Sequence, residues 1–369
     1  MDTEKRKEGY VVAMDSFKGC LTSQEACAAV AQGLREYRGA EAVEVPVSDG
    51  GDGMTEALKD SITGYEERHC QTHDALMRPC DAVYLISGEK VIIEVAQACG
   101  ISRLKGETLR PLSATSFGVG ELLIDAIRAG GRQFYIGLGG TATSDCGLGM
   151  LQAFKEGWLR MHGTFDVALR TWTDVNPQLE SLGLQVTLLS DVTNPLCGPM
   201  GSAYVFGPQK GANEEEVRLL EHRARSFARM SASHFGFDYS QRPGAGAAGG
   251  LGYAFMQYFN ASVQSGAEAI LDLIGFDTRL EGRPAGVFTG EGKSDGQTLM
   301  GKLPMIILGH CRKYGVACHL LAGKVEDEDE LIKAGFASVK SINPEGIDPK
   351  EMLKPETARH NLSLAVKPC

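Results

Sequence analysis

The chain has 369 residues, of which 43% are apolar and 23% are charged, and its formal net charge is −10. Because one hydrophobic core rarely serves so long a chain, two domains are expected. The acidic balance argues against a sequence-independent nucleic-acid binder, since the phosphates of a nucleic acid require a basic face.

The distribution of apolar residues and cysteines favours a cytoplasmic protein. No run of about 18 apolar residues occurs, so no membrane span is expected. The apolar run at residues 10–14 is too short for a signal peptide. The 10 cysteines include no C-x-x-C pair, so neither a zinc site nor a disulfide framework is expected.

The first segment is typical of a strand, a loop and a helix. Residues 10–14 predict the strand, and Thr22 with Glu25 forms a capping box before the helix. Residues 43–47 predict a second strand, followed by the sequence SDGGDGM. Open α/β sheets bind ligands at the carboxyl ends of their strands. The polar residues predicted at this edge are Asp15, Lys18, Asp49 and Asp52.

The pattern changes near His69, where we place a domain boundary. Residues 83–86 and 91–95 predict a hairpin, so an antiparallel element interrupts the parallel arrangement. Residues 157–184 are weakly patterned and are interpreted as a surface excursion. The other predicted elements are a helix over 116–129, strands over 133–136 and 185–190, and helices over 214–234, 247–259 and 267–274.

The parallel pattern returns at residue 285. The predicted elements there are a strand over 285–288, a glycine-rich loop, a helix over 299–314, a strand over 316–321, a helix around Glu330 and a strand over 338–342. We therefore predict an α/β fold with two α/β domains. A Rossmann-like parallel-sheet domain consists of residues 1–70 and 285–369, and a mixed α/β domain is inserted over residues 71–284.

The segment TGEGKSDGQTLMGK, residues 289–302, combines glycines with charged residues. At a strand-to-helix turn, Gly290 and Gly292 would let backbone N–H groups hold an anion. A P-loop is excluded, because the glycine that it requires five residues before Gly292 is Val287 here. The residues able to bind a metal, take a proton or neutralise phosphate are Glu291, Lys293 and Asp295.

Three further loops leave alternatives open. GAGAAG at 244–249 has the letters of a dinucleotide fingerprint, but no predicted strand precedes it. It is either an anion-binding helix N-terminus or a set of glycines for tight helix packing. Residues 139–145 place amide donors, hydroxyls and a carboxylate between a strand and a helix. Asp191, close to Asn194, is either a turn residue or a catalyst.

Polar loops at predicted strand ends are more numerous than turns alone require. They cover residues 15–23, 48–53, 138–149, 191–211 and 289–302. Phosphoryl transfer needs such groups, because amides and lysines hold phosphate oxygens and carboxylates hold a divalent cation. The absence of H-E-x-x-H argues against a zinc peptidase.

Six ordered motifs together resemble the type I glycerate kinase family across nearly the whole chain. They are DSFKGCLTS, SDGGDG, GLGGTATSDCGLGM, SDVTNPLCG with FGPQKGA, PGAGAAGGLG and TGEGKSDGQTLMGK. The resemblance implies ATP-dependent phosphorylation of D-glycerate at the 2-hydroxyl, in a cleft between two α/β domains. A kinase for the 3-hydroxyl or for a related hydroxy acid is the alternative, and a non-catalytic regulator is a third.

Two motifs depart from the family pattern. The family has Ala-Asp-Gly-Gly-Glu-Gly where this chain begins with Ser48 and has Asp52, which keeps the charge and shortens its reach. At the position of residues 293–295 the family has Arg-Leu-Asp, and this chain has Lys293 in place of the arginine. An ammonium binds phosphate as a point charge rather than through the bidentate geometry of a guanidinium.

The resemblance and the residue chemistry give each candidate a role. Asp191 is expected to orient or deprotonate the glycerate hydroxyl, Lys18 and Lys293 to offset anionic charge, and Asp295 to act as a further catalytic carboxylate. The expected Mg²⁺ ligands are Asp49, Asp52 and Glu291, with Asp295 as another candidate. Nucleotide phosphates are expected on Gly139, Gly140, Thr141, Thr143, Gly246, Gly249 and Gly250. Further substrate or cofactor contacts are expected from Asp15, Ser16, Asn194, Gly290 and Gly292.

Overall fold

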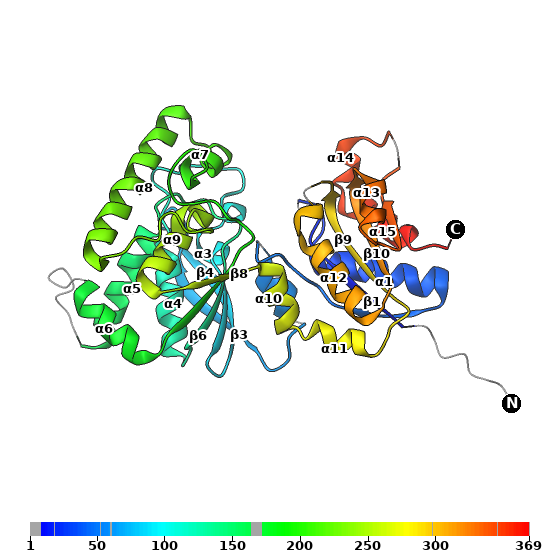
Figure 1. The fold of residues 1–369 in the computed structure, drawn as a ribbon, viewed down its shortest axis with the longest axis horizontal. Helices are drawn as coiled ribbons and strands as arrows, with labels where there is room; N and C mark the ends of the chain where they lie inside the picture. The colour runs from blue at the N-terminus through cyan, green and yellow to red at the C-terminus, as the bar shows by residue number, and fades with distance from the viewer. Residues whose placement is uncertain are drawn as a thin grey trace. The chain divides into compact units, whose positions relative to one another are not determined.

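The computed structural model describes residues 9–17, 19–51, 53–59, 61–163, 172–296, 298–344 and 346–368. These residues form two compact units (Figure 1). Unit 1 contains the N-terminal segment up to Asp49, Glu56–Thr63 and the chain from Ala267 onward, and unit 2 contains Gly50–Thr55 and Gly64–Gly266. Each unit combines one β-sheet with helices, which confirms the predicted α/β class.

Unit 1 contains a parallel sheet of five strands in the order β11-β10-β9-β1-β2. The strands are β1 (Gly9–Met14), β2 (Glu41–Glu44), β9 (Gly286–Ser294), β10 (Cys318–Val325) and β11 (Ser338–Ser341). From β1 the chain goes first to one side of the sheet and later to the other, so the strand order reverses between β1 and β9. Such a switch point is where open α/β sheets bind ligands.

Helices pack against the unit 1 sheet and bury its apolar side chains. The capping box predicted at Thr22 and Glu25 is present at the start of α1 (Ser23–Arg38). Side chains from α1, the sheet and α15 (Pro355–Ala365), among them Leu34, Phe288 and Leu362, form one buried core. The remaining helices of the segments around this sheet are α2 (Met54–Lys59), α10 (Gly266–Leu273), α11 (Phe276–Glu281), η4 (Thr298–Met300), α12 (Leu303–Tyr314), α13 (Glu328–Lys333) and α14 (Pro349–Met352).

Unit 2 contains a mixed sheet of six strands in the order β3-β4-β5-β6-β7-β8. The first three strands, β3 (Glu66–His73), β4 (Pro79–Ser87) and β5 (Lys90–Glu94), pair antiparallel. The next pairings, from β5 through β6 (Gln133–Gly137) and β7 (Gln185–Leu189) to β8 (Ser262–Gln264), are parallel. The predicted hairpin is therefore confirmed as β4 and β5. The predicted boundary at residue 71 falls inside β3, and the division into domains stays a prediction.

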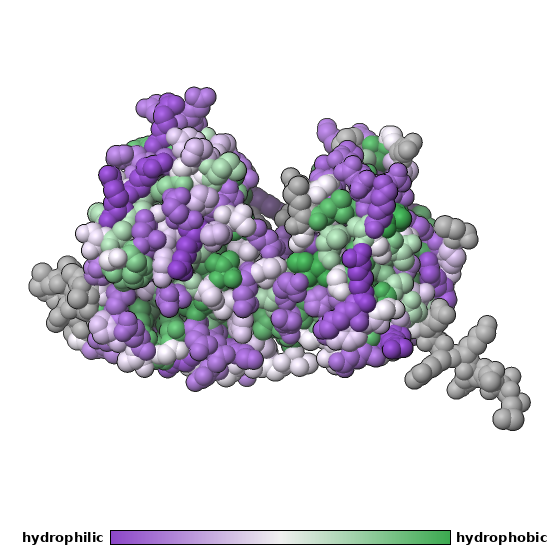
Figure 2. Space-filling view, viewed as in Figure 1, coloured by the Kyte–Doolittle hydropathy of each residue, from purple (hydrophilic) through white to green (hydrophobic). Residues whose placement is uncertain are grey.

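The helices of unit 2 pack around one large apolar core, with a smaller apolar cluster between α7 and the start of α8. They are α3 (Ala96–Cys99), η1 (Ile101–Leu104), α4 (Phe117–Arg128), α5 (Leu148–Met161), α6 (Trp172–Leu182), α7 (Ser202–Phe206), η3 (Pro208–Lys210), α8 (Glu214–Phe235) and α9 (Ala247–Phe259). Hydrophilic residues cover α8 in Figure 2. None of the described helices is both long enough and apolar enough to cross a bilayer.

The surface excursion predicted over 157–184 is wrong where the structure describes it. Residues 157–161 belong to α5, and α6 follows at Trp172–Leu182. Trp158, Val175 and Leu179 are buried in the core of unit 2, so these helices have an apolar face. The pattern is weak because Pro177 lies inside α6, and residues 164–171 lie outside the described residues.

Candidate active site

The carboxyl end of β1 carries the first predicted site residues of unit 1. Asp15 and Ser16 follow β1 at the switch point between β1 and β9. The N–H of Asp15 donates to the carbonyl oxygen of Gly290 at 3.0 Å. The N–H of Ser16 donates to the carboxylate of Asp15 at 2.7 Å. The fold therefore brings these three residues together at the edge where ligands bind in related sheets.

Strand β9 is longer than the sequence indicated. Strand β1 ends opposite Gly290, whereas β9 continues to Ser294 by pairing with β10. Gly290 and Gly292 therefore lie within a strand, and α12 begins only at Leu303. A Cβ added at Gly290 would lie 2.0 Å from the carbonyl oxygen of Leu321, so this glycine permits close strand packing. The predicted strand-to-helix turn is wrong, and ligand binding by these glycines stays a prediction.

Two carboxylates lie near one ammonium in β9 and the loop that follows it. Glu291 is buried, and its Oε1 accepts the hydroxyl groups of Ser294 at 3.0 Å and Thr298 at 2.7 Å. The Nζ of Lys302 lies 3.7 Å from Glu291 Oε2 and 3.7 Å from Asp295 Oδ1. The structure thus brings Glu291 and Asp295 to the same ammonium, and metal binding by these carboxylates stays a prediction.

Lys293 has a different environment from these carboxylates. Its side chain is 49% exposed, and its Nζ lies 3.1 Å from Asp295 and 3.0 Å from Glu326. Hydrogen bonds to Glu326 and then to Asp295 raise the pKa of Lys293. Two carboxylates therefore already balance the charge of this ammonium. To offset phosphate charge as predicted, Lys293 must break one of these ion pairs and contact the phosphate instead.

A buried carboxylate of unit 2 holds the glycine-rich segment that follows Asp49. Glu94, at the end of β5, accepts the N–H of Gly53 at 2.9 Å and the N–H of Thr55 at 3.0 Å. Glu94 thereby caps the N-terminus of α2, whose helix dipole favours a negative charge at that end. Two of the predicted residues in these motifs, Lys18 and Asp52, lie outside the described residues.

The loop after β6 is the next predicted site. Gly139 and Gly140 lie at the end of β6, followed by the buried Thr141 and Thr143. The loop is fixed by Asp145, whose carboxylate is surrounded by donors. Its oxygens accept the N–H groups of Ser116, Gly147 and Gly149 and the hydroxyl of Ser116, at 2.8 to 3.1 Å. Asp145 therefore has a structural role.

Lys210, at the end of η3, reaches this loop from a distant part of the sequence. Its side chain is 3% exposed. Its Nζ donates to the Thr141 hydroxyl at 3.1 Å and to the Thr143 carbonyl oxygen at 2.6 Å. Burial lowers the pKa of Lys210 to about 8. A buried ammonium thus supports the loop that was predicted to hold nucleotide phosphates.

The glycines of GAGAAG and the next residue, Gly250, pack closely against the backbone of neighbouring loops. A Cβ added at Gly249 would lie 2.0 Å from the carbonyl oxygen of Thr143, and one at Gly246 would lie 2.3 Å from that of Pro195. A Cβ at Gly250 would lie 2.9 Å from the Cα of Cys146. These contacts support the interpretation that the glycines allow tight packing. Phosphate binding by Gly246, Gly249 and Gly250 stays a prediction.

Asp191 and Asn194 follow β7 at the same edge of the unit 2 sheet. Asp191 is exposed, and its Oδ1 accepts the N–H of Gly266 at 3.2 Å. The side-chain amide of Asn194 donates to the carbonyl oxygen of Met200 at 2.8 Å, which fixes the turn. The exposed carboxylate of Asp191, at the end of a parallel strand, can accept a proton from a bound hydroxyl. Asn194 stabilises the turn through Met200, and its predicted contact with a ligand stays a prediction.

Comparison with known proteins identifies the family of the chain. The sequence profile of the glycerate kinase family matches residues 10–367. The chain belongs to the glycerate kinase family. It is 35% identical over 347 residues to a glycerate kinase of Halalkalibacterium halodurans, covering 90% of each chain, and 35% identical over 345 residues to glycerate 2-kinase of Escherichia coli, again covering 90% of each.

A solved structure agrees with this assignment. A crystal structure of a Salmonella typhimurium LT2 protein assigned as glycerate kinase 2 matches with a TM-score of 0.76 and 29% identity, covering 98% of this chain and 97% of the other. The predicted resemblance to glycerate kinases is therefore confirmed. The family function is ATP-dependent phosphorylation of glycerate, and the chain is accordingly a phosphotransferase.

Sequence analysis of this glycerate kinase missed three residues that the structure places at the site. Lys302 lies at the end of a recognised motif but was not singled out. Glu94 ends an apolar strand, and a carboxylate in that position is itself a signal for a residue at the carboxyl edge of a sheet. Lys210 stands in the recognised motif FGPQKGA, yet nothing local to the motif shows that its ammonium is buried.

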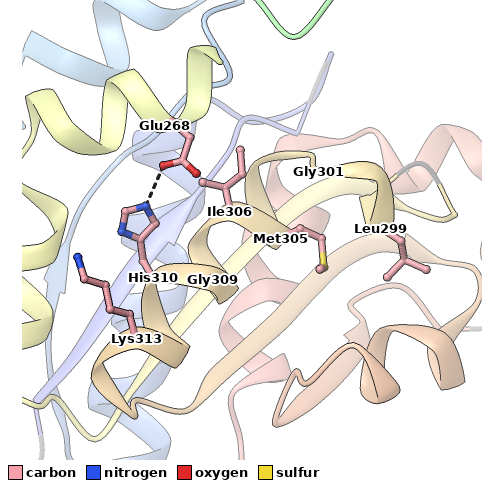
Figure 3. Close-up of a pocket in the computed structure, with 8 residues that line it drawn as sticks. All are labelled: Glu268, Leu299, Gly301, Met305, Ile306, Gly309, His310 and Lys313. Carbon is pink, nitrogen blue, oxygen red and sulfur yellow. Dashed lines mark hydrogen bonds and ion pairs between the residues drawn. The ribbon is translucent and has the colours of Figure 1, made fainter. Parts of the chain in front are cut away.

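A separate pocket of the glycerate kinase lies in unit 1 along α12 (Figure 3). Its volume is about 510 Å³, and Figure 3 shows His310, on α12, directed at Glu268, on α10. His310 Nε2 lies 3.1 Å from Glu268, and His310 Nδ1 lies 2.5 Å from Asp277 on α11. Burial lowers the pKa of His310, but hydrogen bonds to Asp277 and Glu268 outweigh it and the net pKa is raised. The histidine therefore ties three helices together.

The carboxylates of the described chain fit a Mg²⁺ ion only in part. No group of three or more described histidine, cysteine or acidic residues is arranged to hold a metal ion by itself. Glu291 and Asp295 are instead two carboxylates that share one neighbour, the ammonium of Lys302, at 3.7 Å from each. This suits Mg²⁺ in kinases, which usually takes one or two protein carboxylates and completes its coordination with water and phosphate oxygens.

Proposed function

We propose that the chain transfers the γ-phosphoryl group of ATP to the 2-hydroxyl of D-glycerate, giving 2-phosphoglycerate and ADP. The observation that carries the proposal is the concentration of carboxylates, lysines and exposed amides at the carboxyl edges of both sheets, in a glycerate kinase family chain. One relative of similar length is named glycerate 2-kinase. In the reaction, the 2-oxygen forms a bond to the γ-phosphorus, the bond from that phosphorus to the β,γ-bridging oxygen breaks, and the hydroxyl proton leaves.

Asp191 is the proposed acceptor of that proton. Its carboxylate is exposed at the end of β7, where its Oδ1 accepts the backbone N–H of Gly266 at 3.2 Å. A positioned base contributes about 10² or more to the rate. We expect Asp191→Asn to lower kcat by at least that factor. The result that contradicts this role is turnover within about threefold of wild type in Asp191→Asn, together with loss of activity in Asp295→Asn.

Phosphate charge is proposed to be offset by lysines and Mg²⁺. Glu291 and Asp295, with Asp49 and Asp52 as further candidates, would hold Mg²⁺, which supplies positive charge to the phosphate oxygens when bound. Lys293 and Lys18 would then balance the remaining anionic charge, and Lys302 would keep Glu291 and Asp295 oriented. We place the reaction in the cytoplasm, because the described cysteines are all free thiols.

Regiochemistry is the first test of the proposed function. The product of ATP and D-glycerate is supplied to enolase without phosphoglycerate mutase, and formation of phosphoenolpyruvate is followed. Enolase uses 2-phosphoglycerate, so immediate formation supports transfer to the 2-hydroxyl. A signal that appears only after mutase is added shows transfer to the 3-hydroxyl instead. Absence of ATP consumption with any short hydroxy acid and Mg²⁺ would point to a regulator.

A further inference from the structure

The buried ammonium of Lys210 has no acidic partner in the described part of unit 2. Its two hydrogen-bond acceptors are the neutral oxygens of Thr141 and Thr143. The nearby carboxylate, Asp145, is already surrounded by the N–H and hydroxyl donors of Ser116, Gly147 and Gly149. A buried charge without a partner is costly, so proteins usually pair it. The structure therefore contains a positive charge whose balancing anion does not come from the described residues.

The loop above this ammonium is open to a ligand. Gly140 is exposed and Ser144 is half-buried. The backbone N–H groups of both residues donate to no acceptor among the residues that the structure describes. Gly249 leaves room for the Thr143 carbonyl oxygen, which approaches Lys210 to 2.6 Å. Two amide donors without a described acceptor thus belong to the same short loop whose Thr141 and Thr143 oxygens accept from the ammonium, an arrangement that favours an anion.

We propose that Lys210 is a positioning residue and the buried counter-charge for an anionic group, a phosphate or a carboxylate, bound on residues 139–144. The inference rests on the proposed function, because ATP and glycerate both carry such groups. Lys210 acts through Thr141 and Thr143: its two hydrogen bonds fix the loop conformation, and its charge attracts the ligand through the loop.

The arrangement couples anion binding to the protonation of Lys210. Burial lowers the pKa of Lys210 to about 8 in the ligand-free protein. An anion on the loop favours the charged form, so it raises this pKa and the complex takes up a proton. Two other titratable groups lie near Lys210. Burial raises the pKa of the Cys99 thiol to about 12, so it stays neutral at pH 8.5. Asp145 is held by its hydrogen bonds.

Calorimetry measures this uptake directly. Wild-type protein is titrated at pH 8.5 with MgADP and, separately, with D-glycerate, in two buffers of different ionisation enthalpy. We expect roughly 0.7 proton to be taken up per molecule of the ligand that occupies the loop, and roughly tenfold weaker affinity at pH 9 than at pH 7. Uptake with MgADP identifies a phosphate on the loop, and uptake with D-glycerate identifies a carboxylate. Binding of both ligands with no uptake overturns the proposal.

Variants separate this role from a merely structural one. Lys210→Met should abolish the uptake, and Lys210→Arg should do the same because a guanidinium stays charged throughout this pH range. Lys333, an exposed lysine on α13, provides the control: Lys333→Met should keep the full uptake. Uptake that persists in a folded Lys210→Met or Lys210→Arg protein overturns the proposal. If neither variant folds, the wild-type titrations still decide it.

Activity in the same preparations distinguishes the two hypotheses. ADP formation from ATP and D-glycerate is measured at pH 7, where wild-type Lys210 is charged. Activity without proton uptake at pH 8.5 contradicts the role of Lys210 and leaves the kinase proposal standing. Proton uptake on MgADP binding without phosphorylation of glycerate contradicts the proposed function and supports the counter-charge.

Discussion

Glu94 ends β5 with a side chain that has no exposed surface, and it accepts the N–H groups of Gly53 and Thr55. These two bonds attach the segment after Asp49 to the carboxyl edge of the unit 2 sheet. The carboxylate suits this position because both of its oxygens are acceptors, whereas an amide would turn one donor toward a backbone N–H.

We therefore expect Glu94→Gln to lower the free energy of unfolding by about 1 to 3 kcal/mol, the cost of leaving a buried donor without an acceptor. Urea denaturation followed by circular dichroism measures the change. Glu107→Gln is the matched control, since Glu107 is exposed and pairs with Arg78 at the surface, and its effect should stay within about 0.5 kcal/mol. Equal effects of the two substitutions would show that the Glu94 contacts contribute little.

Individual site residues could be predicted where chemistry and position coincide in the sequence. Asp15, Glu291 and Asp295 stand at or beyond the end of a recognisable predicted strand. The structure places Asp15 and Glu291 next to the switch point of unit 1, and Asp295 directly after the end of β9. Lys210 could not be recognised in this way, because its partner Thr141 is 69 residues away. Burial and partner depend on the packing of unit 2, and neither is written in the local sequence.

At the scale of elements, the bounds of helices and strands were predicted well where apolar residues recur at a regular spacing, and poorly where that spacing is interrupted. The helix α8 and the hairpin of β4 and β5 were predicted close to their observed bounds. Strand β9 was predicted to end at Phe288, but it continues to Ser294 through pairing with β10. The residues by which the observed strand exceeds the predicted one, 289–294, are small or charged. Hydrogen bonding to β10 rather than side-chain hydrophobicity therefore determines the length of β9.

The loop that begins α9 allows a test of the packing role of its glycines. Gly249 has φ +66°, and a Cβ there would lie 2.0 Å from the carbonyl oxygen of Thr143. Gly183, after α6, has φ +68° with nothing within 4 Å of an added Cβ. Both alanine variants carry the same backbone strain, so their difference measures the collision alone.

We expect Gly249→Ala to destabilise the protein by about 1 to 3 kcal/mol more than Gly183→Ala, the usual cost of overpacking. Thermal and urea unfolding of the two variants gives the comparison. If both variants lose the same stability, the loop has room for a side chain at residue 249. The close packing of Gly249 on Thr143 would then not explain why the motif is rich in glycine.

At the scale of the whole molecule, the two sheets differ in how they create a ligand edge. The unit 1 sheet has a reversal of strand order between β1 and β9, the position at which open α/β sheets bind ligands. The parallel strands of unit 2 follow one another without a reversal. Its edge is instead built by loops held by buried polar residues, Glu94, Asp145 and Lys210. Strand order follows from the complete chain path, so the sequence could predict parallel sheets but not this difference.

The stability of the molecule should also depend on pH through the three helices that meet at His310. Both ring nitrogens of His310 face carboxylates, Glu268 and Asp277, and neutral imidazole has a single N–H, so only the imidazolium donates to both. Lys313 and Tyr314 also face Asp277. Burial raises the pKa of Asp277, but hydrogen bonds from Lys313, His310 and Tyr314 outweigh it and bring the pKa to about 2.

Because the folded-state pKa of His310 is raised, its contribution is fully present below the unfolded-state pKa of about 6.5 and is lost as pH rises through the folded-state value. We expect the free energy of unfolding of His310→Gln to fall below wild type at pH 6 by on the order of 1 kcal/mol, with a smaller difference at pH 9. Urea denaturation at both pH values measures this. The control is His222→Gln, on the exposed face of α8, for which the difference should not change with pH. An increasing deficit of His310→Gln at pH 9 would reverse the inferred sign, because it would mean that neutral His310 stabilises the helices better than the imidazolium does.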